Sequence, residues 1–313
     1  MKNKAIGFAV FLRVFRIAYH PIYKHPLPVG HRFPMEKYEL LPEQLLYEGI
    51  VAPQQFFQPG ILSDDIVHLV HDSTYLRRLK NGELSEKEQR KIGFPWSEAL
   101  VERELRIAQG TVEASHFALE FGVSFNIAGG THHAYRDSGE GFCMLNDQAI
   151  AAAYLLHKKL AHQILMIDLD VHQGNGTAAI FQDDQRVFTF SMHGADNYPL
   201  HKEKSDWDIP LLVGIGDFDY LNELSRSIQV FRKELKPDFI FYQAGVDVLG
   251  TDKLGKLKLS REGCKKRDEL VLKYAQEQNI PVVVCMGGGY SARIADIVDA
   301  HVNTYRVAYD LFG

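Results

Sequence analysis

The chain has 313 residues, of which 46% are hydrophobic and 24% charged, the composition of a folded globular protein with a sizeable core. A formal net charge of −5 and the lack of a long basic run argue against a dedicated nucleic-acid-binding arm. The three cysteines, Cys143, Cys264 and Cys285, form no CxxC pair, so we expect a reducing compartment and a cytoplasmic protein.

Residues 1–20 begin basic and then become apolar, but Arg13 and Arg16 interrupt the apolar run and disfavour a secretion signal. We expect a leading strand around Phe15–Tyr19 instead. No later stretch approaches the roughly 20 apolar residues that a membrane span needs, so no membrane partner is expected. Residues up to about 100 are less regular, and their prolines predict loops that shape a rim: Pro26, Pro28, Pro34, Pro53, Pro59 and Pro95.

From residue 102 onward two patterns alternate. Short apolar runs predict buried parallel strands, and they begin at Val123, Ile164, Arg186, Asp238 and Pro281. Longer amphipathic stretches predict helices at 102–121, 147–162, 220–236, 261–279 and 291–311. This alternation predicts an α/β sheet with helices on both faces. No repeat or linker divides the chain, so we expect a single domain over 1–313.

Polar segments follow the five predicted strands: GGTHH, DLDVHQGNG, SMHG, QAGVD and MGGGY. Ligands of open α/β sheets bind beyond the carboxyl ends of the strands, so these segments are expected to converge. Asp168, Asp170 and His172 lie within five residues, and Asp247 follows another strand. Carboxylates and an imidazole suit a divalent ion of zinc or iron type, and three protein ligands leave one position open for catalysis. Alternatively, these acids cap strands and helices, or serve as the Asp-x-Asp of a nucleotide-sugar enzyme.

Two histidines and a tyrosine extend this chemistry. His132 and His133 are adjacent after a glycine pair, and beside a metal they are best interpreted as general acid–base groups. Anionic ligands leave a zinc-bound water less acidic than three imidazoles would, so a neighbouring base is needed. Tyr290 follows three glycines, and its phenol can donate to the oxyanion that forms when water attacks an amide. The alternative for Tyr290 is a packed residue behind a helix-opening turn.

Taken together, these segments resemble the histone deacetylase family over residues 17–310. GGTHHA, GEGFCMLND, DLDVHQGNGT, SMH, AGVD…DKLG and GGGY stand in the family's order and spacing. HRFPMEKY at 31–38 and the HQGNG variant are most similar to the class IV branch and its bacterial relatives. The resemblance implies the arginase/deacetylase fold, a three-layer αβα sandwich with a mostly parallel central sheet.

The resemblance also implies a role for each matching position. Zn²⁺, with Fe²⁺ as the alternative, would be held by Asp170, His172 and Asp247. His133 would be the general base and acid, Asp168 would orient His132, and Tyr290 would polarise the carbonyl. The remaining matches are Gly141 and Phe142 in the acyl-lysine tunnel wall, Leu254 at the rim, Arg32 in an acetate-exit channel, and a structural potassium site formed by Asp168, Ser191 and the carbonyls of Asp170, His172 and Met192.

Three departures from the family pattern stand out. Asn175 replaces the second carboxylate that orients a tandem histidine, so His133 would have a neutral partner. The loop GFPWS at 93–97 lacks an aspartate that clamps the substrate backbone in many members. Tyr198 and Leu200 both lie where the opposite tunnel aromatic is expected, and the sequence does not choose between them.

We therefore expect a zinc-dependent amide hydrolase that removes acetyl or longer acyl groups from lysine side chains, on proteins or peptides, or from a related acylated amine. An acetylpolyamine or small-molecule deacetylase is the alternative, and a non-catalytic acyl-lysine-binding protein is a further one. A two-manganese hydrolase of guanidino groups is disfavoured because Gly174 and Leu249 stand where its extra carboxylates belong. The oligomeric state stays open.

Overall fold

The computed structural model describes residues 15–313. Residues 1–14, which include Arg13 and most of the segment considered as a secretion signal, lie outside the described residues. A single eight-stranded sheet runs through the centre, in the order β2-β1-β3-β8-β7-β4-β5-β6. Every neighbouring pair is parallel. The strands are β1 Arg16–Ala18, β2 Phe56–Phe57, β3 Val123–Asn126, β4 Ile164–Asp168, β5 Val187–Gly194, β6 Trp207–Leu211, β7 Phe239–Gln243 and β8 Val282–Cys285.

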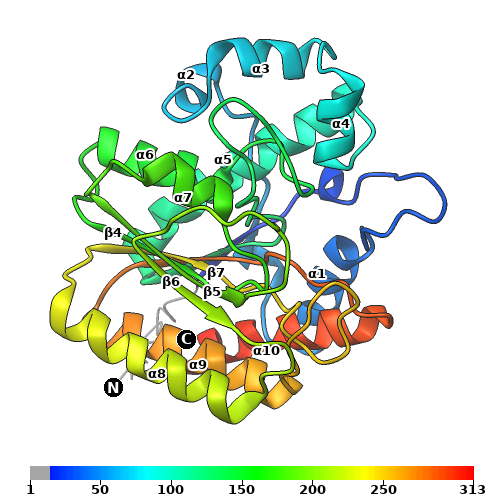
Figure 1. The fold of residues 1–313 in the computed structure, drawn as a ribbon. Coiled ribbons are helices and arrows are strands. Elements are labelled where there is room, and N and C mark those ends of the chain that lie inside the picture. Colours follow the sequence, from blue (N-terminus) through cyan, green and yellow to red (C-terminus); the bar gives the residue numbers. More distant parts are fainter. Residues whose placement is uncertain (1–14) are drawn as a thin grey trace, which may run out of the picture.

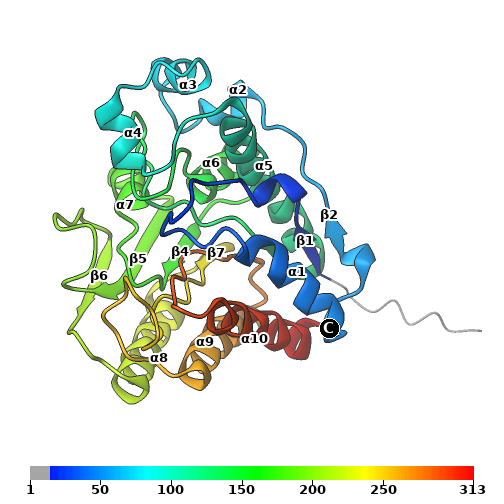
Figure 2. The same cartoon turned by 90° about the vertical axis from the view of Figure 1, so that its right-hand side faces the viewer.

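Helices cover both faces of this sheet (Figure 1). α5 Glu98–Phe121, α6 Asp147–His157 and α7 Asn175–Phe181 lie on one face. α1 Lys37–Tyr47, α8 Asp217–Glu234, α9 Arg261–Gln278 and α10 Ile294–Phe312 lie on the other, as the turned view also shows (Figure 2). The predicted three-layer α/β architecture is confirmed, and so are the five predicted strands, the leading strand and the five predicted helices to within a few residues.

The central strands are apolar because both of their faces are covered. Every residue of β3, β4, β7 and β8 is buried. A strand without a solvent-facing side has no need of polar alternation, so its sequence reads as a continuous apolar run. The edge strands β2 and β6 lack this signal, because β2 has two residues and β6 is mostly half-exposed.

The first hundred residues are more regular than the prolines predicted. α1 runs through Pro42, and the short helices α2 Asp64–Val67, α3 Ser73–Lys80 and α4 Glu86–Ile92 follow it. The last three lie beyond α5, away from the sheet (Figures 1 and 2). The prediction of loops over this region was therefore wrong in part. The segment from His25 to Met35 does form a loop that borders a cavity, and the end of α4 borders another. No helix among residues 15–313 is long and apolar enough to cross a membrane.

The parallel register fixes where polar residues meet. Asp168, the last residue of β4, pairs with Ser191 of β5 on one side and Gln243 of β7 on the other. Asn126 at the end of β3 pairs with Cys285 at the end of β8. All carboxyl ends therefore lie at one edge of the sheet, and the segments that follow these strands enter the same region.

Candidate active site

Three predicted metal ligands meet at this edge. Asp170 and His172 lie in the segment between β4 and α7, and Asp247 follows β7; each offers an atom within 4.8 Å of the others. The Nδ1 atom of His172 lies 3.0 Å from Asp170 Oδ1 and 3.1 Å from Asp247 Oδ2. All three side chains are buried. This is the only such cluster of His, Cys, Asp and Glu residues within 15–313.

The electrostatics of this cluster fit a divalent cation. Burial, together with the neighbouring Asp170 carboxylate, raises the pKa of Asp247 to about 7, because two anions in one dry site repel each other. Burial lowers the pKa of His172, but its contacts with both carboxylates outweigh burial and raise it to about 10. The two carboxylates therefore favour positive charge at the position they surround. A metal ion held by these oxygen and nitrogen atoms meets that demand.

Glycines make room around the two carboxylates. A Cβ atom on Gly288 would collide with the carboxylate oxygens of Asp247 and Asp170, and one on Gly245 would collide with Asp170. The backbone N–H of Gly288 also donates to Asp170 Oδ2 at 2.8 Å. Val171 N–H donates to Asp247 Oδ1 at 2.9 Å. These contacts fix both carboxylates in place, with their oxygens around the candidate metal position.

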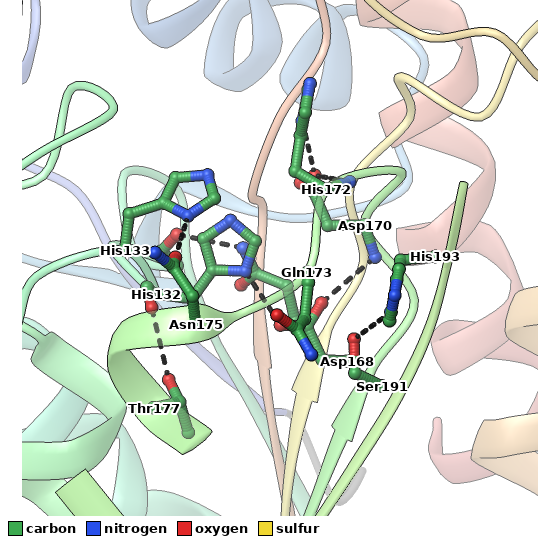
Figure 3. A network of polar contacts seen from close by, with 12 residues as sticks. His132, His133, Asp168, Asp170, His172, Gln173, Asn175, Thr177, Ser191 and His193 are labelled. Carbon is green, nitrogen blue, oxygen red and sulfur yellow. Dashed lines mark hydrogen bonds and ion pairs between the residues drawn. The ribbon is translucent and has the colours of Figure 1, made fainter. Parts of the chain in front are cut away.

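The tandem histidines lie side by side with different partners (Figure 3). Their ring centroids are 4.1 Å apart. His132 Nδ1 lies 2.7 Å from Asp168 Oδ2, and His133 Nδ1 lies 2.6 Å from Asn175 Oδ1. Burial acts against the charged form of His132, but Asp168 outweighs it and raises the pKa of His132. Burial and the charges of His132 and His172 hold the pKa of His133 well below its usual range. The surroundings thus push the pKa values of the two imidazoles in opposite directions, as paired acid–base groups require.

A buried carboxylate sets the orientation of Asn175. The amide Nδ2 of Asn175 donates to Glu140 Oε1 at 2.6 Å and to the Tyr135 hydroxyl at 2.9 Å. A carboxylate only accepts hydrogen bonds, so it selects the Nδ2 side of the amide and turns Oδ1 toward His133. His133 must then donate from Nδ1. Its Nε2 is left as the basic nitrogen.

Glu140 is held by two further groups. Lys91 forms an ion pair with it, and the Tyr198 hydroxyl donates to its Oε1 at 2.8 Å. The Glu140 side chain is 6% exposed, whereas that of Lys91 is 51% exposed. The negative charge is therefore inside the protein and its counter-charge is at the surface.

Tyr290 borders the metal ligands from the segment after β8. Its ring centroid lies 6.3 Å from that of His172 and 6.2 Å from that of Phe142. The backbone N–H of Tyr290 donates to Asp252 Oδ2 at 2.6 Å, and this bond anchors the segment. Burial, and then Asp247 and Asp170, raise the pKa of Tyr290 well above its usual value. The phenol therefore stays protonated and can donate a hydrogen bond.

Two adjoining cavities lead to these groups. The inner cavity has a volume of about 40 Å³ and the outer one about 270 Å³. The two cavities share five lining residues: His133, Gly141, Phe142, His172 and Tyr290. The outer cavity opens between the segments around Gly93, Tyr198 and Leu254. A passage that ends on the candidate metal ligands can admit a long side chain with a reactive group at its tip.

Comparison with known proteins agrees with this geometry. The family model described as "Histone deacetylase domain" matches residues 31–305. The chain belongs to the histone deacetylase family. Membership in this family indicates that the protein is a deacetylase, a type of hydrolase. The family is generally metal-dependent.

Relatives in this family cover most of the chain. An uncharacterized protein of Picosynechococcus sp. is 45% identical over 298 residues, which are 95% of this chain and 99% of that protein. Histone deacetylase 2 of Arabidopsis thaliana is 31% identical over 283 residues, 86% of this chain and 73% of that protein. The crystal structure of a histone deacetylase homologue from Aquifex aeolicus has a TM-score of 0.79 at 24% identity, over 93% of this chain and 82% of that one. This structural likeness supports the fold.

The structure places all four predicted substrate-binding residues around the outer cavity, with Arg32 at its mouth. Gly141, Phe142 and Leu254 line it. Gly141 has a φ of 58°, and a Cβ there would come within 2.6 Å of His133 Cδ2, so this position requires glycine. Tyr198 also lines the cavity, with its ring 5.1 Å from that of His133. Leu200 is 87% exposed and does not line it, so the structure assigns the tunnel position to Tyr198.

Arg32 does not lie where the resemblance implied. It is exposed at the mouth of the outer cavity, and its guanidinium lies 5.0 Å from the centre of the Phe142 ring. Arg103 lines the inner cavity instead, where it is buried and paired with Glu104. The acetate-exit role inferred for Arg32 rested on a short motif match, and the exposure of Arg32 at the mouth does not fit that role. Arg103, by contrast, is carried into the interior by α5, a long helix packed on the sheet.

Lys37 is another residue that the sequence reasoning missed. It is buried, donates from Nζ to Gly287 O at 3.2 Å, and lies 5.5 Å from the centre of the Tyr290 ring. Burial lowers the pKa of Lys37 to about 8. The segment HRFPMEKY contains this lysine, and GEGFC contains Glu140, so both lay in quoted motifs. Their burial was the missing information.

The predicted monovalent-cation residues are adjacent. Asp168 and Ser191 are register partners, and Met192 follows on β5. Asp168 Oδ1 accepts from Asp170 N–H at 3.1 Å, and Ser191 Oγ lies 2.9 Å from His193 Nδ1 (Figure 3). The potassium site itself stays a prediction.

Proposed function

We propose that this protein is a zinc-dependent deacylase that removes acetyl or longer acyl groups from lysine side chains of proteins or peptides. The observation that carries the proposal is the buried cluster of Asp170, His172 and Asp247 at the end of a passage, beside two histidines and a tyrosine. We further propose that the described sheet and its helices act as one catalytic domain, and that the chain works in the cytoplasm. Fe²⁺ is the alternative ion.

Each group has a distinct task in this proposal. An ion held by Asp170, His172 and Asp247 would supply Lewis acidity toward the acyl carbonyl and the attacking water. His133 accepts the water proton at Nε2, because its Nδ1 is engaged by Asn175. His132 is paired with Asp168, which favours a positive charge on the His132 ring beside the reacting atoms.

Tyr290 acts on the carbonyl oxygen. Its phenol donates a hydrogen bond as negative charge develops there, and donors of this kind contribute most when they are fixed in advance. The water oxygen then bonds to the acyl carbon, the amide C–N bond breaks, and His133 returns its proton to the departing amine. The products are a carboxylate and a free lysine amine.

The experiment that tests this function is an acyl-chain panel. Acetyl-, butyryl-, octanoyl- and myristoyl-lysine peptides, together with acetylspermidine, would be incubated with purified protein of measured zinc content. We expect amine release from at least one acyl-lysine peptide, and its loss in His133→Ala. Binding of all peptides without hydrolysis by the zinc-loaded protein would favour a non-catalytic acyl-lysine-binding protein.

A further inference from the structure

The mouth of the outer cavity is positively charged, although the chain as a whole is negative. The chain carries 40 acidic and 35 basic residues. Among the residues that line this cavity, four are lysine or arginine and one is acidic: Arg32, Arg90, Lys91 and Lys256 against Asp196. All five are exposed. The local excess of positive charge is therefore opposite in sign to the net charge.

Two of these cations have no carboxylate partner among residues 15–313. Arg32 lies over the Phe142 ring and forms no ion pair. Lys256 donates from Nζ to the backbone oxygen of Asp196 at 2.7 Å and likewise forms no ion pair. A substrate carboxylate could pair with either cation without displacing an existing partner.

The other two cations are paired in ways that leave them accessible. Arg90 pairs with Glu86 at 3.2 Å on the outer surface of α4, where both side chains are more than 70% exposed. Such a pair contributes little and opens easily. Lys91 pairs with the buried Glu140, and half of its own side chain faces solvent. The mouth therefore presents cations to solvent around its rim.

We propose that this mouth selects acyl-lysines carried by acidic peptide segments, with aspartate or glutamate close to the modified lysine. The inference rests on the proposed deacylase function and names its substrate class. The anionic group belongs to the carrier, because the unpaired cations that line the two cavities lie at the mouth. Arg103 in the inner cavity is already paired with Glu104. A cationic polyamine, by contrast, would meet like charge at the mouth.

The test compares three acetyl-lysine peptides of equal length whose flanking residues are acidic, neutral or basic, using zinc-loaded protein. We expect kcat/KM to be about 5- to 10-fold higher for the acidic than for the basic peptide in dilute buffer. This preference should shrink in 1 M salt, where the Debye length is only about 3 Å. Equal kcat/KM for the three peptides would overturn the inference and leave the deacylase function intact.

Charge reversal supplies the control. Arg32→Glu combined with Lys256→Glu should invert the order of the three peptides. Lys273→Glu, on an exposed position of α9, makes a single charge reversal away from the cavity and should keep the order. An unchanged order of kcat/KM for the three peptides in the double variant would contradict the role of Arg32 and Lys256 in selecting acidic peptides. A succinyl-lysine peptide preferred over the acidic acetyl-lysine peptide would also contradict it, since the anion would then lie on the acyl group.

Binding separates this inference from the proposed function. The affinities of labelled acidic and basic acetyl-lysine peptides would be measured on the His133→Ala protein, which should not turn them over. Tighter binding of the acidic peptide supports the inference even if the wild-type protein hydrolyses neither. Equal affinities overturn it whatever the turnover.

Discussion

Replacing Asn175 with aspartate should damage this protein, because Glu140 lies beside it. Asn175 Nδ2 is 2.6 Å from Glu140 Oε1, so Asn175→Asp would set two carboxylate oxygens against each other in a buried site. Two carboxylates at this separation cannot both ionise. Holding one carboxyl protonated at pH 7 instead of about 4 corresponds to a shift of about 3 pKa units, or about 4 kcal/mol. The Lys91 counter-charge reduces this, so we expect a loss of about 2–3 kcal/mol.

The assay is a double-mutant cycle by urea unfolding at pH 7. Glu140→Gln removes the second anion, and in the double variant N175D/E140Q the new amide can donate to the carboxylate introduced at position 175. The double variant should therefore be more stable than the sum of the single effects predicts, by at least about 1.5 kcal/mol. Single effects that add to within about 0.5 kcal/mol would refute the reasoning, because they would show that the two side chains do not interact.

The same cycle predicts a change in pH dependence. A general base works when it is neutral, so kcat/KM falls as pH drops through the pKa of His133. Burial, with the charges of His132 and His172, holds that pKa well below its ordinary value. The fall of kcat/KM at low pH should therefore have its midpoint below about pH 6.5 in the wild-type protein. An ionised carboxylate at position 175 favours the charged imidazole. The midpoint of this fall in kcat/KM should therefore lie about 1–2 pH units higher in N175D/E140Q than in E140Q.

Three further predictions concern the metal ligands and the tyrosine. Tyr290→Phe should lower kcat by about 100-fold with little change in KM, because a fixed oxyanion donor is lost; an effect on KM alone would contradict this role. Gly288→Ala should abolish zinc binding measured by metal analysis, because its Cβ would collide with both carboxylates, whereas Gly60→Ala, with open space around its Cβ, should keep it. Removing the metal with a chelator should lower Tm, since an ion at about 100 times its Kd stabilises the native state by about 2.7 kcal/mol; an unchanged Tm after proven metal loss would argue against this site.

The positions of site residues could be predicted from the sequence wherever they follow from the topology of the parallel sheet. Asp247 is far along the chain from Asp170 and His172, but both segments follow parallel strands, and parallel strands end at one edge. The same rule brought His132, His133 and Tyr290 to that edge. Continuous apolar runs predicted the central strands because both sheet faces are covered.

Positions set by loop conformation were beyond reach of these rules. Gly141 and Phe142 both have positive φ, and this unusual turn carries Glu140 inward to Asn175. Nothing in the periodicity predicts such a turn. Tyr198 and Leu200 are two residues apart, and only the loop backbone directs the tyrosine into the cavity. α1 was not predicted; it runs through Pro42 and packs against α10.

The central claim is that this site hydrolyses acyl-lysine through His133 beside a bound metal. The most direct measurement is acetate release from an acetyl-lysine peptide under single-turnover conditions, by wild-type and His133→Ala proteins of equal zinc content. We predict a rate at least about 100-fold lower in the variant, the contribution expected of a positioned base. Equal rates in the two proteins would contradict the claim.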